Sequence, residues 1–120
     1  MKIAITATGM DLTSQMDQRL GRAPYFLMVD SKTFDFFALE NTQNLHLPKG
    51  AGIQAGKTIV DNGAEVVITG NCGPKAFQVL DKAGIDIITG ASGRIKDVIE
   101  SYNKGDLKPS KAPNVEGHWV

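Results

Sequence analysis

A six-residue pattern occurs twice in this chain, each time between an apolar segment and a helical one. Residues 68–73 read Ile-Thr-Gly-Asn-Cys-Gly, and residues 88–93 read Ile-Thr-Gly-Ala-Ser-Gly. Gly63, Gly84 and Gly105 bracket the two copies, at positions where a glycine supplies the left-handed conformation that ends a helix. The pattern predicts two consecutive strand-loop-helix units whose strands run parallel in one sheet.

Apolar periodicity predicts the other elements of an α/β fold. The first three strands are expected at residues 2–7, 25–29 and 33–39, and the strands of the two repeated units at 65–69 and 85–89. A turn at residues 30–32 makes the second strand antiparallel to the third. Three main helices are expected: one ending at Asn62-Gly63, one beginning at Pro74, and one with Ser92 as its N-cap.

Length and composition set the broad class. A chain of 120 residues has room for one domain, which we assign to residues 1–105, and residues 106–120 are expected to form a flexible C-terminal tail. The formal net charge is zero, which argues against nucleic acid or an anionic membrane as a partner. With one cysteine, no leader-like apolar run and a strand-like start, the sequence predicts a cytoplasmic protein.

The ligand site is expected where the parallel strands end. Ligands of open α/β sheets bind outside the carboxyl ends of the strands, where helix N-termini favour anions. The long polar loop at residues 8–23 should meet both glycine loops there, and it carries Arg19 and Arg22, while Arg94 opens the last helix. Tight turns alone would also explain the glycines, and solvated surface charge would also explain the arginines. The candidate residues from these loops are Thr8, Gly9, Arg19, Gly21, Arg22, Gly70, Asn71, Cys72, Gly73, Pro74, Gly90, Ala91, Ser92, Gly93 and Arg94.

Two side chains are candidate metal ligands. Cys72 lies where a helix N-terminus could lower its thiol pKa. A small buried residue that fills space in the core is an equally good interpretation of Cys72. His46, in a polar loop, is the other candidate. No paired carboxylates, phosphate-binding lysine loop or dinucleotide fingerprint is present, so the sequence does not indicate an enzyme.

Several segments together resemble the dinitrogenase iron-molybdenum cofactor family. They are residues 2–5, residues 17–26, the Gly50-Ala51-Gly52 helix start and residues 66–76. The resemblance implies a ribonuclease-H-like mixed sheet without nuclease activity, and it adds Gly50 and Ala51 to the candidate site. It also implies non-covalent binding of a metal-sulfur cluster, either a mixed molybdenum-copper sulfide or an iron-molybdenum cofactor precursor. Family members often have a histidine where this chain has Lys49, which weakens the case for histidine ligation.

The sequence therefore leaves three functions to compare. The first is a non-catalytic binding or carrier protein for a molybdenum-containing cluster, with partner proteins in a cluster-assembly or regulatory complex. The second is a metal-free regulatory or protein-protein interaction module. The third is a small hydrolase or transferase that uses Cys72, which is the least supported because only His46 and His118 could act as its base.

Overall fold

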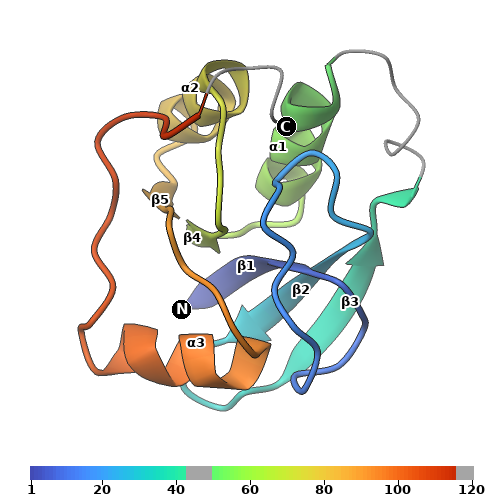
Figure 1. Cartoon of the computed structure of the whole chain (residues 1–120), viewed down its shortest axis with the longest axis vertical. Coiled ribbons are helices and arrows are strands. Elements are labelled where there is room, and N and C mark those ends of the chain that lie inside the picture. Colours follow the sequence, from blue (N-terminus) through green and yellow to red (C-terminus); the bar gives the residue numbers. More distant parts are fainter. Residues whose placement is uncertain (43–49, 116–120) are drawn as a thin grey trace.

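A five-stranded mixed sheet forms the middle layer of the computed structural model, which describes residues 1–42 and 50–115. Helices α1 (Ala51–Asp61) and α2 (Pro74–Lys82) cover one face of the sheet, and α3 (Ile95–Asn103) covers the other (Figure 1). Among the described residues, no helix is long and apolar enough to cross a lipid bilayer. The three predicted helices are thus confirmed, and they form one layer on each face of the sheet.

The strand order is β3-β2-β1-β4-β5. The strands are β1 (Lys2–Ala7), β2 (Tyr25–Asp30), β3 (Phe36–Glu40), β4 (Val66–Ile68) and β5 (Asp86–Ile88). β2 is antiparallel to both β1 and β3, whereas β1, β4 and β5 run parallel. This arrangement confirms the predicted ribonuclease-H-like mixed sheet with an antiparallel second strand, and it brings the carboxyl ends of β1, β4 and β5 to one edge.

Alternation along the strands divides the apolar side chains between two cores. Ala4 of β1 and Val67 of β4 point toward α1 and α2, where they pack with Ile59 and Leu80. Their neighbours along the same strands point toward α3 and pack with Ile95, Val98 and Ile99. Substituting alanine for a buried leucine or isoleucine of either core typically costs ~2–5 kcal/mol of folding free energy, so the packing of both helical layers contributes strongly to stability.

Some element boundaries differ from the predicted ones. β3 begins at Phe36 and not at residue 33, because the Asp30 carboxylate accepts hydrogen bonds from the N–H groups of Lys32 (2.8 Å) and Thr33 (3.1 Å). These bonds, first that of Thr33, hold the pKa of Asp30 below its ordinary value. Phe34 also takes a positive φ of 63°, which extends the turn by several residues. β4 and β5 are shorter at both ends than predicted.

The segment after α3 lies against the domain. Residues 106–115, the described part of the predicted tail, run along the side of β5 toward α2 (Figure 1). The Ser110 N–H donates to the carbonyl oxygen of Ile87 at 2.6 Å, and the Asn114 N–H donates to that of Cys72 at 3.2 Å. We refer to residues 106–115 as the strap. Its anchors are isolated polar side chains without periodicity, which a sequence pattern does not reveal.

Candidate functional site

The long loop of residues 8–23 crosses the strand-end edge from one face of the sheet to the other. Its Met16 belongs to the core under α3, whereas its Leu20 belongs to the core under α1 and α2. At the crossing point the Asp17 N–H donates to the Thr6 carbonyl oxygen (3.0 Å), and the Thr6 hydroxyl donates to the Asp17 carbonyl oxygen (2.7 Å). The loop is therefore a structural part of both cores, and the predicted meeting of the three strand-end loops is confirmed.

The start of α3 is occupied by this loop. The N–H groups of Ile95 and Lys96 donate to the carbonyl oxygens of Ser14 and Leu12, both at 2.9 Å. Ser92, the predicted N-cap, is exposed and does not cap the helix; the N-cap is Arg94, which makes no side-chain cap bond. The prediction for Ser92 was wrong because backbone carbonyls of a distant loop replace the side-chain cap. The N–H groups of Ile95 and Lys96 are therefore not available to bind an anion.

The starts of α1 and α2 differ from that of α3. Neither has a side-chain cap: the N-cap residues are Gly50, with a φ of 82°, and Gly73. Within residues 1–42 and 50–115, the N–H groups of Ala51 and Gly52 in α1, and of Lys75 and Ala76 in α2, donate to no acceptor. Such groups and the helix dipole favour an anion. The two helices pack against each other, so the two starts lie on the same side of the sheet (Figure 1).

Residues 19–22 of the long loop connect these two helix starts. The Leu20 N–H donates to the Asn71 carbonyl oxygen at 3.3 Å, and Arg19 forms an isolated bridge with Asn71. Gly21 lies against α1 so closely that an added Cβ would be 2.7 Å from the Gly52 nitrogen. Arg19 is exposed and Arg22 is half-buried. The loop thus places Arg19 and Arg22 on the segment that joins the two helix starts.

The two glycine loops are in direct contact. The Gly90 N–H donates to the Gly70 carbonyl oxygen at 2.8 Å, and the Gln18 side chain donates to the Ala91 carbonyl oxygen at 3.3 Å. A Cβ added at Gly70 would collide with the Gln18 side chain and lie 2.9 Å from its Cα. Gly70 is therefore required by close packing between loops, whereas Gly90 and Gly93, with φ of 81° and 106°, have open space above them.

Cys72 is a buried, protonated thiol. Its exposed fraction is 0%, and burial raises its pKa from 9.0 to about 12. The Sγ donates to the Gly73 carbonyl oxygen at 3.6 Å. The suggestion that the α2 N-terminus lowers this pKa is wrong, because desolvation of the thiolate outweighs the helix dipole. Cys72 is therefore placed as a small core residue beside the site.

We expect Cys72→Ala to change the alkaline stability profile. A raised folded-state pKa stabilises the native protein below the unfolded pKa, and this stabilisation is lost as pH rises toward the folded value. Wild type should therefore lose stability between pH 9.0 and about 12, and Cys72→Ala should lose less over that range. Urea unfolding at several alkaline pH values measures the difference; identical slopes for the two proteins would contradict the buried thiol.

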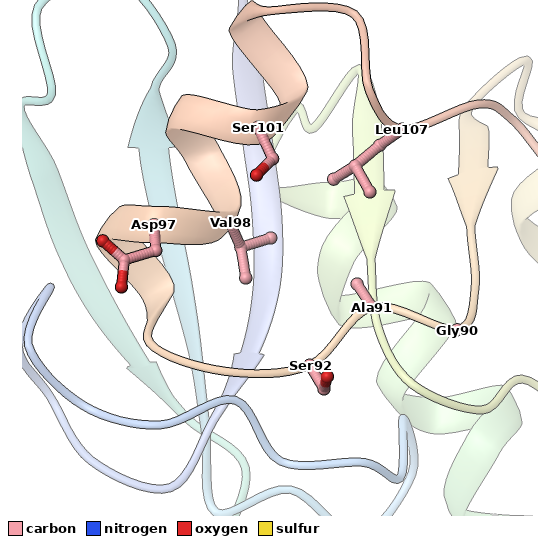
Figure 2. A pocket seen from close by; sticks show the side chains of 7 residues that line it. All are labelled: Gly90, Ala91, Ser92, Asp97, Val98, Ser101 and Leu107. Atoms are coloured by element: carbon pink, nitrogen blue, oxygen red, sulfur yellow. The ribbon is translucent and has the colours of Figure 1, made fainter.

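A pocket of about 220 Å³ lies on the α3 side of the edge. Figure 2 shows Val98 and Ser101 of α3 facing the Gly90–Ser92 loop, with Leu107 of the strap as another wall. Asp97 supplies its charged group, and none of the arginines lines it. The negative charge makes this pocket the less suitable place for an anion.

The structure thus divides the predicted residues into two groups. Thr8, Gly9, Ser92, Gly93 and Arg94 lie around the occupied start of α3, where the Thr8 N–H donates to the Gln15 carbonyl oxygen (3.0 Å) and Gln15 bridges Arg94. Gly90 and Ala91 lie between the groups. The residues at the starts of α1 and α2 are Arg19, Gly21, Arg22, Gly50, Ala51, Gly70, Asn71, Cys72, Gly73 and Pro74.

Other residues of the edge were not singled out from the sequence. Gln18 joins the two glycine loops, and Lys75 adds an exposed cation at the start of α2. Asn114 contacts the glycine loop that precedes α2. Lys75 had a signal, since it follows Pro74 at a helix start, whereas Asn114 had none. His46 and Lys49 lie outside the described residues. In the described part of the chain, no three His, Cys, Asp or Glu side chains are grouped to hold a metal ion.

Comparison with known proteins gives a consistent result. The family model described as "Dinitrogenase iron-molybdenum cofactor" matches residues 1–105. The chain is similar to the apo form of the orange protein from Desulfovibrio gigas, with 36% identity, a TM-score of 0.92 and coverage of 95% of this chain and 96% of that one. It is also similar to a putative NifB protein from Thermotoga, with 28% identity, a TM-score of 0.81 and coverage of 97% and 98%. An uncharacterized protein of Methanocaldococcus jannaschii is 26% identical over 113 residues, 90% of each chain.

Proposed function

The chain belongs to the dinitrogenase iron-molybdenum cofactor family, and we propose that it is a non-catalytic binding or carrier protein for an anionic, molybdenum-containing metal-sulfur cluster. The cluster is its cargo. We propose a mixed molybdenum-copper sulfide as the first candidate and an iron-molybdenum cofactor precursor as the second. The protein would act in the cytoplasm and pass the cluster to partner proteins of an assembly or regulatory complex.

The observation that carries the proposal is the pair of uncapped helix starts joined by an arginine-bearing loop. The N–H groups of Ala51, Gly52, Lys75 and Ala76 have no acceptor within the described residues, and Arg19 and Arg22 lie on the segment between them. Backbone N–H groups and guanidinium groups both donate hydrogen bonds to anions. This donor set supports an anion held by many weak contacts.

The chemistry of a metal sulfide fits these donors. A thiometallate is large, polarisable and weakly hydrated, as is a guanidinium group, so the pair loses little hydration on contact. Cys72 is buried and protonated, which supports a site in which the chain supplies no thiolate ligand. Binding would then depend on the cluster's charge and shape, and release to an acceptor protein would require no metal-ligand bond to break.

Anaerobic reconstitution tests the proposal. The protein is incubated with tetrathiomolybdate and Cu(I), desalted, and examined by absorption spectroscopy and elemental analysis. We expect a visible chromophore that remains with the protein, with molybdenum and copper in a fixed ratio. Tetrathiomolybdate alone and Cu(I) alone are the controls, and a colourless, metal-free protein after all three treatments would refute the proposal.

A metal-free interaction module is the second candidate, and one observation favours it. β3 is an edge strand in the described part of the sheet, and it exposes Phe36 (40%) and Phe37 (47%). Exposed aromatic side chains on a strand that is paired on one side only are suited to contact with another protein. A partner captured by metal-free protein, lost on Phe37→Ser and unaffected by Arg19→Gln, would favour this function over cluster binding.

A further inference from the structure

The strap contacts both glycine loops of the edge through one side chain each. Ser110 serves the loop after β5: its hydroxyl accepts from the Thr89 N–H at 3.3 Å and lies 2.7 Å from the Thr89 hydroxyl. Asn114 serves the loop after β4. The segment between these two anchors spans the distance between the loops, so the strap links the two repeated strand-loop units from outside the sheet (Figure 1).

Asn114 makes the denser set of contacts. Its Oδ1 accepts a hydrogen bond from the Cys72 N–H at 2.8 Å, and its Nδ2 donates to the Gly70 carbonyl oxygen at 3.0 Å and to Asn71 Oδ1 at 3.3 Å. Its own N–H donates to the Cys72 carbonyl oxygen at 3.2 Å. The amide therefore satisfies the polar backbone of residues 70–72, immediately before the α2 N-cap Gly73.

The position of the amide oxygen is informative. The Cys72 N–H belongs to the residue immediately before the α2 N-cap Gly73, so it is next in sequence to the N–H groups at the start of α2. A side-chain carbonyl oxygen on this donor occupies the place that an acceptor atom of an anion would take. Asn114 is itself exposed, so water can replace its hydrogen bonds at small net cost when it leaves.

From these contacts we infer that the strap is a latch that competes with the ligand: Asn114 holds the Cys72 N–H in the ligand-free protein, and uptake of the anion displaces Asn114 and loosens residues 110–115. This inference rests on the proposed function. A ligand that binds only the unlatched form has its apparent affinity reduced by the unlatched fraction. Weakening the latch therefore strengthens binding, and binding in turn opens the latch.

Trypsin provides a direct readout, because Lys111 lies between the two anchors and is exposed. Cleavage after Lys111 should be slow in ligand-free wild type and several-fold faster when the protein holds tetrathiomolybdate and Cu(I), which are the probe. Cleavage after Lys104, which precedes the strap, is the internal reference and should not change. Mass spectrometry separates the two products.

Asn114→Ala should bind the same probe with an apparent Kd about tenfold lower than wild type, and it should be cleaved rapidly after Lys111 even without the probe. Asn103→Ala is the matched control, since the Asn103 amide donates to the Ser31 carbonyl oxygen (2.8 Å) far from the glycine loops; its affinity should equal that of wild type. Ser110→Ala, which weakens the other anchor, provides a second variant and should also bind more tightly.

The outcomes separate the latch from the proposed function. If wild type binds the probe but Asn114→Ala binds equally or less tightly, or if the probe leaves Lys111 cleavage unchanged, the latch is refuted and cluster binding stands. If wild type binds no probe, cluster binding is refuted and the latch falls with it. Faster ligand-free cleavage of Asn114→Ala reports the strap contact itself in either case.

Discussion

Gly21→Val is expected to destabilise the protein by about 3 kcal/mol and to abolish cluster uptake. A Cβ at this position would be 2.7 Å from the Gly52 nitrogen and 2.9 Å from the Ala51 carbonyl carbon. Both are backbone atoms of the first turn of α1, so no side-chain rotation relieves the collision. The loop must move away from the helix, which separates the arginines from the α1 start. Urea unfolding and probe binding measure the two effects.

The matched control is Gly105→Ala. Gly105 has a positive φ of 81° but open space around the position of a Cβ. Alanine there should cost only the conformational penalty of about 1 kcal/mol and leave probe binding unchanged. An unfolding midpoint for Gly21→Val equal to that of wild type would contradict the close contact between the loop and α1.

The double substitution Arg19→Gln/Arg22→Gln should weaken binding of the molybdenum-copper probe by about 100-fold or more. Hydrogen bonds to charged groups contribute about 1.5–3 kcal/mol each, and two are lost with their positive charges. Wild-type affinity should also fall as ionic strength rises, and the double variant should show a weaker salt dependence. Titration of the reconstituted chromophore at two salt concentrations measures both quantities, with thermal unfolding to check that the variant remains folded.

Arg94→Gln is the control for charge alone. It removes one positive charge from the same edge, but beside a helix start whose N–H groups already bind the Ser14 and Leu12 carbonyl oxygens. Its effect on affinity should therefore be small, about threefold or less. If Arg94→Gln and Arg19→Gln lowered the affinity for the probe equally, the ligand would not lie at the starts of α1 and α2 alone. It would lie over the whole strand-end edge or on its α3 side.

Regular patterns allowed most of the fold to be predicted from sequence. The repeated Ile-Thr-Gly segments and the glycines after the helices predicted the parallel units, and the positive φ of Gly63 (78°) and Gly84 (76°) confirms that part of the reasoning. The hairpin was predicted but misplaced, since the Asp30 carboxylate and the conformation of Phe34 extend the turn. Such side-chain-to-backbone contacts have no periodicity, so a sequence pattern does not reveal them.

The edge of the sheet was predicted in outline, and its details depend on contacts between distant segments. Ser92 is a good N-cap residue by type, yet the cap of α3 comes from carbonyl groups about 80 residues earlier in the chain, at Leu12 and Ser14. The sequence around Cys72 is compatible with both a metal ligand and a core residue, and it is the burial of the thiol that decides its pKa. Neither the cap of α3 nor the burial of Cys72 can be predicted from the neighbouring residues in the sequence.

The path of residues 8–23 limits how this protein can diversify. Surface loops usually tolerate insertions because little depends on them, but here two positions inside the loop are anchored in different hydrophobic cores, Met16 on one face and Leu20 on the other. Lengthening it between these anchors would disturb both faces of the sheet. In related chains, new ligand preferences should therefore arise by exchange of individual side chains between these two anchors, where the length of the loop is fixed.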